Sequence, residues 1–95
     1  DGVLYNKDFT ILIYYPISNT NEKYVVDSRC KILGKHSFYL CNNLKEVELP
    51  ASVIKLENNP FSGCNQITLN NKSPYYHVDD FVIYDRDYSS VIGCL

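Results

Sequence analysis

The chain of 95 residues lacks tryptophan and methionine, and neither sign of charge dominates it. Its net charge of −2 gives no electrostatic reason to expect nucleic acid or an anionic membrane as a partner. No run of about 18 apolar residues is present, so the sequence predicts no membrane insertion. No secretory signal segment is present either. The abrupt start ("DGVLY") and end ("VIGCL") lead us to expect a piece of a longer protein.

The chain does contain one phrase twice, "FYLCNNL" from Phe38 and "FSGCNQI" from Phe61. The offset that places Phe38 on Phe61 also places Cys41 on Cys64, and the apolar positions before them coincide too. We call this offset of 23 the repeat period. Units that cannot bury an apolar face alone stack on one another, so this pattern predicts a structural repeat. The predicted repeat core comprises Leu33, Phe38, Cys41, Leu44, Val47, Leu49, Val53, Leu56, Phe61, Cys64 and Ile67.

A second repetition has a different spacing. "DGVLYNKDFTILI" opens the chain, and "DFVIYDRDYSSVI" matches it from Asp80 onward, an offset of 79 that we call the hairpin offset. Each copy is a β-rich run, a polar turn and another β-rich run, which predicts a β-hairpin. Because 79 is not a multiple of 23, the hairpin is interpreted as an insertion that itself recurs along a longer array. We therefore expect a hairpin insertion over 1–16, stacked repeats over 24–69 and a second hairpin over 76–95.

Within the repeats, "LKEVELP" from Leu44 to Pro50 predicts a short strand that ends at the proline. "SVIKLE" predicts a second extended piece. "GKHSFYLC" and "NNPFSGC" predict compact turns, each a single helical or 3₁₀ turn that places Phe and Cys in the core. The predicted fold class is mostly β with short helical turns, a solenoid of 23-residue coils flanked by β-hairpins.

The four cysteines, at positions 30, 41, 64 and 94, have no spacing typical of a metal site. Cys41 and Cys64 occupy equivalent positions, and Cys30 falls where the next coil has Val53, so we expect buried apolar thiols. A Cys41–Cys64 disulfide stays open as an alternative, because neighbouring coils approach the required separation of about 7 Å.

Other polar residues are candidates for catalysis or metal binding. His36 precedes Cys41 in a predicted turn, but a nucleophilic pair needs an orienting group and an oxyanion site that the sequence does not supply. The acidic residues Asp79, Asp80, Asp85 and Asp87 lack the alternation of a calcium loop and are interpreted as turn caps. Asn42 and Asn65 are interpreted as structural amides. The sequence therefore predicts no catalytic residue, no metal and no cofactor.

The run L-x-x-V-x-L-P-x-S-V-x-x-L-x-x-x-x-F-x-x-C from Leu44 to Cys64 resembles the leucine-rich repeats of the BspA-like (Treponema) type. The segment from Asp1 to Pro16 also resembles an insertion common in bacterial members. There are departures: Asp27 replaces the usual proline, Glu57 the usual glycine, and Ser37 and Pro60 the small alanine before Phe.

The resemblance implies a bacterial protein that is secreted or lies at the cell surface, in a family that includes adhesins. The favoured function is a non-catalytic adhesion or protein-interaction module that binds a host or microbial macromolecule. The alternative is a structural spacer that projects another domain. We also expect end-to-end self-association through exposed stacking faces. The candidate partner-binding residues are Glu46, Glu48, Lys55, Glu57, Tyr75 and Tyr76.

Overall fold

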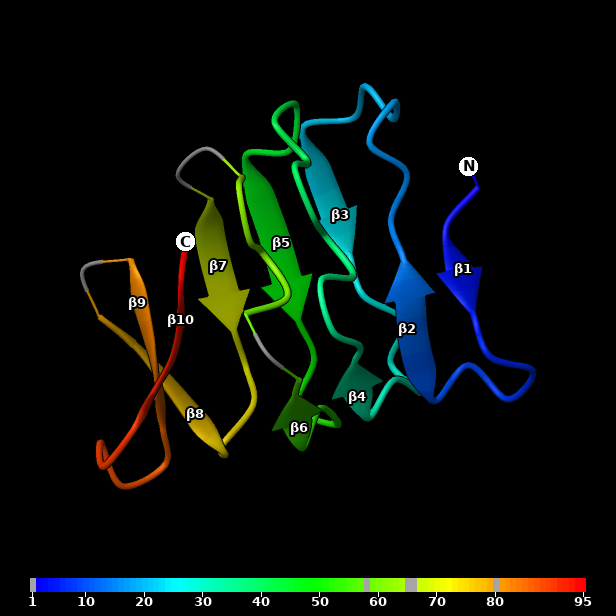
Figure 1. Ribbon diagram of the computed structural model, residues 1–95. Helices are drawn as coiled ribbons and strands as arrows, with labels where there is room; N and C mark the ends of the chain where they lie inside the picture. The colour runs from blue at the N-terminus through cyan, green and yellow to red at the C-terminus, as the bar shows by residue number, and fades with distance from the viewer. Residues whose placement is uncertain (1, 58, 65–66, 80) are drawn as a thin grey trace.

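A computed structural model describes residues 2–57, 59–64, 67–79 and 81–95, which form three β-sheets (Figure 1). The first sheet has the order β1 (Leu4–Tyr5), β2 (Ile11–Tyr14), β4 (Ile32–Leu33), β6 (Lys55–Leu56). The second has the order β3 (Lys23–Val25), β5 (Glu46–Leu49), β7 (Thr68–Asn71). The third has the order β10 (Val91–Cys94), β9 (Val82–Asp85), β8 (Tyr76–Asp79).

The chain alternates between the first two sheets, and each circuit adds one parallel strand to each of them (Figure 1). Lys23 pairs with Glu46, and Ile32 pairs with Lys55, so partners on successive circuits are separated by the repeat period. Glu46 pairs with Thr68, so the next step is shorter by a single position. These neighbouring circuits, which we call coils, therefore lie in register side by side.

The core fills the space between the first two sheets. Because successive side chains of a strand point to opposite faces, one row of each sheet faces inward. The inward row of the first sheet is Leu12, Leu33 and Leu56. Every residue of the predicted repeat core is buried except Cys64, which is half-buried.

A column of stacked aromatic rings runs through this core. The ring centroids of Tyr15 and Phe38 are 5.2 Å apart, and those of Phe38 and Phe61 are 5.0 Å apart. All three rings are almost fully buried. Because each ring follows the previous one by exactly one repeat period, the column places one ring in each successive coil.

The predicted compact turns before the cysteines form and place Phe38, Phe61 and Cys41 in the core. The helical form predicted for them is wrong, because the described residues contain no helix and no 3₁₀ helix. His36 and Leu40 have φ of 53° and 54°, a left-handed conformation that interrupts helical hydrogen bonding.

Isolated i→i+3 bonds close these turns, such as the Tyr39 N–H to the His36 carbonyl at 3.1 Å, and further bonds join the turns of neighbouring coils. The Phe38 N–H donates to the Pro60 carbonyl at 2.8 Å, and the Leu40 N–H donates to the Ser62 carbonyl at 3.0 Å.

Gly63 shows why these turns fit so closely. It is the equivalent of Leu40 in the next coil and is also left-handed, with φ of 76°. A Cβ atom at Gly63 would lie 2.5 Å from Cδ2 of Leu40. The end of the exposed Leu40 side chain could move aside, so the left-handed φ is the stronger reason for glycine at this position.

The first hairpin pairs β1 with β2 in antiparallel fashion, and one asparagine organises its turn. Oδ1 of Asn6 accepts hydrogen bonds from the N–H groups of Thr10 at 2.8 Å and Ile11 at 3.0 Å. Phe9, at the end of the turn, has φ of 61° and donates its N–H to the Asn6 carbonyl at 3.0 Å.

The second hairpin, β9 with β10, has the same turn at the equivalent positions. Oδ1 of Asp85 accepts hydrogen bonds from the N–H groups of Ser89 at 2.7 Å and Ser90 at 3.2 Å. Tyr88 has φ of 57° and donates its N–H to the Asp85 carbonyl at 3.1 Å. Asp85 thus caps its turn, whereas Asp80 lies outside the described residues.

Candidate functional site

The outer face of the β3–β5–β7 sheet presents six side chains in two rows, and we call it the ladder face. Strand register and alternation define the rows, because residues directly opposite one another share a face. The rows are Lys23–Glu46–Thr68 and Val25–Glu48–Asn70. Their members are exposed or half-buried, so the ladder face is available to a partner.

Two of the predicted partner-binding residues, Glu46 and Glu48, lie on the ladder face. Glu46 pairs with Lys23 at 3.5 Å, and Glu48 pairs with Lys72 at 3.4 Å. Exposed ion pairs of this kind contribute only about 0–1 kcal/mol each. The carboxylates can therefore exchange their lysine partners for cationic groups of another molecule at small cost.

Lys55 and Glu57 lie elsewhere. Lys55 belongs to β6, in the other parallel sheet, and Glu57 follows directly after that strand. Their side chains form a weak ion pair of 3.8 Å. The structure thus does not bring these two residues together with Glu46 and Glu48.

Tyr75 and Tyr76 lie where the last coil meets the second hairpin. The Tyr76 hydroxyl accepts the N–H of Leu56 at 2.8 Å, so it satisfies a backbone donor of β6. Tyr75 is exposed, and the Arg86 guanidinium lies 5.8 Å from its ring centroid. Tyr76 is thus part of the structure of the junction, and Tyr75 is accessible beside it.

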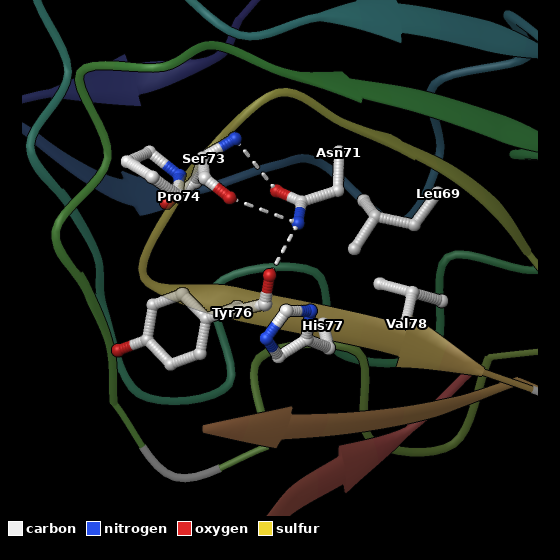
Figure 2. A pocket seen from close by; sticks show the side chains of 7 residues that line it. All are labelled: Leu69, Asn71, Ser73, Pro74, Tyr76, His77 and Val78. Carbon is white, nitrogen blue, oxygen red and sulfur yellow. Dashed lines mark hydrogen bonds between the residues drawn. The ribbon is translucent and has the colours of Figure 1, made fainter. Parts of the chain in front are cut away.

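A pocket of about 390 Å³ opens at this junction, between β7 and β8 (Figure 2). Asn71 organises its polar side, because its Nδ2 donates to the carbonyls of Tyr76 at 3.0 Å and Ser73 at 3.3 Å. Its Oδ1 accepts the N–H of Ser73 at 3.0 Å. The Nε2 of His77 is bonded to the Arg86 carbonyl at 2.9 Å. These hydrogen bonds join β7 to β8 and β8 to the turn of the second hairpin. The polar groups of the pocket therefore have a structural role.

The cysteines form no disulfide among residues 30, 41 and 64, which are free thiols. The Cys41 N–H donates to Sγ of Cys64 at 3.3 Å, and the Cys64 thiol lies 2.8 Å from the Phe38 carbonyl oxygen. Hydrogen bonds from Cys41 lower the pKa of the Cys64 thiol. The pairing with Cys64, together with burial, raises the pKa of the Cys41 thiol. Of the two, Cys64 therefore ionises first.

Other perturbed groups have structural causes. Burial raises the pKa of both Tyr5 and Tyr24, whose hydroxyls are hydrogen-bonded to each other. Hydrogen bonds from Arg29 lower the pKa of the half-buried Asp27 carboxyl to about 2. Within the described ranges, no three His, Cys, Asp or Glu side chains gather to hold a metal ion. The described part of the chain also contains no helix that is long and apolar enough to span a membrane.

Sequence reasoning missed two residues that organise the molecule. Tyr15 is the third ring of the aromatic column, and a further backward shift of one repeat period from Phe38 identifies it. Asn71 has no such signal, because it leaves the repeat pattern. Asn42 is exposed, and the neighbouring Asn43 donates its amide to the Asn19 carbonyl at 3.3 Å. Asn65 lies outside the described residues.

Comparison with known proteins identifies a family match that covers most of the chain. The model of one protein family, described as "BspA type Leucine rich repeat region (6 copies)", matches residues 14–90. No curated protein and no solved structure matches the chain. The matched segment includes both parallel sheets from β3 onward and strands β8 and β9 of the third sheet.

Proposed function

Because the chain belongs to the BspA-type leucine-rich repeat family, we propose that it is a secreted or cell-surface adhesion module. It binds a host or microbial macromolecule through the ladder face, without catalysis. The family suggests an interaction or surface module and is generally non-enzymatic. We propose the adhesive role, the macromolecular ligand and a solenoid of repeated coils together.

The ladder face is the observation that carries the proposal. Its six side chains contribute little to the core, so their identity is free to serve recognition. Lys23, Glu46 and Glu48 supply both charges, and Val25 is 52% exposed and supplies an apolar contact. A flat parallel sheet with neighbouring strands about 4.8 Å apart offers such groups at fixed spacing to an extended protein surface.

The test is a binding screen with matched charge reversals. The chain is immobilised and exposed to a panel of extracellular-matrix and plasma proteins. For any protein that binds, we expect Glu46→Lys with Glu48→Lys to weaken binding at least tenfold. The control is Glu57→Lys, because Glu57 is also a paired surface carboxylate but follows β6, away from the ladder face. Equal loss of binding in the control, or none in the ladder-face variant, would contradict the assignment.

The alternative function is a structural spacer, and the paired charges of the surface favour it. Lys45–Glu22 at 3.7 Å, just before β5 and β3, adds a third ion pair to Lys23–Glu46 and Lys72–Glu48. Much of this surface is therefore internally neutralised. A spacer binds no protein of the panel. Its length instead sets the distance between the domains on either side of it. Absence of binding in the full-length protein, with display of an attached domain retained, selects the spacer.

A further inference from the structure

Cys41 and Cys64 meet where the turns of two neighbouring coils stack. The Leu40 N–H donates to the Ser62 carbonyl at 3.0 Å, so the two turns are bonded to each other directly beside the cysteines. Extended segments that are joined by such bonds lie about 4.8 Å apart. Because Cys41 and Cys64 are equivalent residues at the repeat period, they are close neighbours across this contact.

The Cys64 sulfur already lies against the turn that carries Cys41. Its Sγ atom is 3.3 Å from the backbone nitrogen of Cys41 and 2.8 Å from the Phe38 carbonyl oxygen. The Cys41 thiol pairs with the Cys64 thiol and lies 3.7 Å from the Tyr15 carbonyl oxygen. Disulfide bonds join residues whose Cα atoms are about 4.4–6.8 Å apart. The spacing of the two turns falls within this range, so side-chain rotation brings the sulfurs to bonding distance.

The two thiols differ in how an external reagent meets them. Cys64 is half-buried, and Gly63 before it is exposed, so solvent reaches this turn. Cys41 is only 2% exposed. Because the thiolate is the reactive form of cysteine, the thiol that ionises first also reacts first. Cys64 is therefore the attacking thiol, and Cys41 is held behind it as a second thiol that can resolve the product.

We propose that Cys41 and Cys64 form a redox site, which a small disulfide such as oxidised glutathione converts to a disulfide between the two coils. The Cys64 thiolate attacks one sulfur of the small disulfide, forms a mixed disulfide and releases the first small thiol. The Cys41 thiol loses its proton and attacks Sγ of Cys64, which releases the second small thiol. The two cysteines lose two protons and two electrons, and the reagent is reduced to two thiols.

Cys30 is not placed for this reaction. Its thiol lies 3.3 Å from the Ile32 carbonyl oxygen, in strand β4 of the first sheet. Cys41 and Cys64 instead lie in the turns that precede β5 and β7 of the second sheet. Their disulfide closes a loop of one repeat period, which restricts the unfolded chain and stabilises the folded one. The inference does not depend on ligand binding at the ladder face.

The experiment incubates the folded chain with oxidised glutathione and maps its peptides without reduction. We expect a linked peptide that contains Cys41 and Cys64, and a higher midpoint of urea unfolding. Both changes should reverse after addition of a dithiol reductant. In denaturing urea, where the turns are lost, the same reagent should spread the linkages over all four cysteines. Free thiols at both positions of the native chain, or linkage to another cysteine or another molecule, would overturn the proposal.

Two substitutions separate the roles of the thiols. Cys41→Ala removes the resolving thiol, so the mixed disulfide with glutathione should accumulate on Cys64. Cys64→Ala removes the attacking thiol, so Cys41 should stay free. Cys30→Ala is the control and should form the linkage as fast as the original chain. Glutathione on Cys41 of the Cys64→Ala variant, at the rate seen for Cys64, would contradict the order of attack. If a variant does not fold, the peptide map of the original chain still decides the pairing.

Discussion

At the scale of single residues, the aromatic column accounts for why the phrase around Phe is repeated so closely. Each ring contacts the ring of the coil before it, so a change in one ring affects two coils. Offset or tilted stacking adds about 0.5–1.5 kcal/mol to the burial of each ring. The position therefore tolerates few substitutions, whereas the exposed positions beside it vary.

Phe61→Ala should lower the free energy of unfolding by about 3–5 kcal/mol, because it removes a fully buried ring and leaves a cavity. This is a large part of the roughly 5–15 kcal/mol that stabilises a small domain. Urea unfolding measures the loss. Tyr39→Ala is the control, since Tyr39 neighbours Phe38 in the chain but is 44% exposed, and it should change stability little. Equal effects of the two substitutions would show that the aromatic column does not stabilise the core.

The thiols give a second prediction at this scale. Cys64 should react with iodoacetamide before Cys41, because it is half-buried and ionises first, while Cys41 is buried. Peptide mass mapping after brief alkylation of the folded chain reports the order. Cys30→Ala leaves the comparison intact, since the Cys30 thiol bonds to the Ile32 carbonyl and not to this pair. Modification of Cys41 ahead of Cys64 would refute the order.

At the scale of elements, the two hairpins show that one turn is built with either asparagine or aspartate. Asn6 and Asp85 make the same two side-chain bonds to backbone N–H groups, and each is followed by a left-handed aromatic residue at the end of the turn. The side-chain oxygen, and not the charge, is what the turn requires. Because aspartate carries a charge, the stability of the second hairpin depends on pH, whereas that of the asparagine turn does not.

The pKa of Asp85 is lowered by the Ser89 hydroxyl and by the N–H groups around it. A carboxyl with a lowered pKa in the folded state contributes stability above its unfolded pKa, and the contribution is lost as pH falls through its folded pKa. Asp85→Asn should therefore keep the turn and remove this acid sensitivity, whereas Asp85→Ala should destabilise the hairpin at neutral pH. Thermal unfolding between neutral and acidic pH measures both. If Asp85→Asn is as damaging as Asp85→Ala, the equivalence with Asn6 fails.

Much of this arrangement of elements could be predicted from the sequence, because it depends on periodic apolar positions. Val47 and Leu49 alternate with glutamates, so the strand and its inward face are readable directly. The compact turns before the cysteines were predicted, but their left-handed residues, His36 and Leu40, were not. The bonds that decide their shape join residues of different coils, such as Phe38 and Pro60.

The candidate site was only partly readable for a related reason. Alternation shows that Glu46, Glu48 and Lys55 face outward, but it does not show which sheet each strand joins. That depends on how the chain crosses between sheets, which no local pattern records. Tyr76 is similar, since it was predicted as a partner-binding residue near the hairpin, whereas its hydroxyl accepts the Leu56 N–H.

At the scale of the whole molecule, apolar side chains remain exposed on the outward faces of both hairpins. Leu4 and Ile13 are 52% and 45% exposed on the first hairpin, and Val91 is 61% exposed on the second. Exposed apolar faces and free strand edges favour association between molecules. The chain should therefore associate end to end as its concentration rises.

Sedimentation velocity over a wide concentration range tests this association. We expect Leu4→Lys and Val91→Lys each to reduce it. Val25→Lys is the matched control, because Val25 is equally exposed but lies on the ladder face. A chain that stays monomeric at high concentration, or one that responds only to Val25→Lys, would contradict association through the hairpins.

The register of the parallel sheets also determines how the molecule yields to a pulling force. Each coil touches the next along a row of backbone bonds, and the chain leaves each coil only to enter its neighbour. Tension on the two termini therefore peels coils away one at a time, from an end inward. A peeled coil of one repeat period releases roughly 75–85 Å of contour length, since an extended residue spans about 3.3–3.6 Å. Pulling this chain by its two ends should therefore lengthen it in steps of similar size, one for each coil.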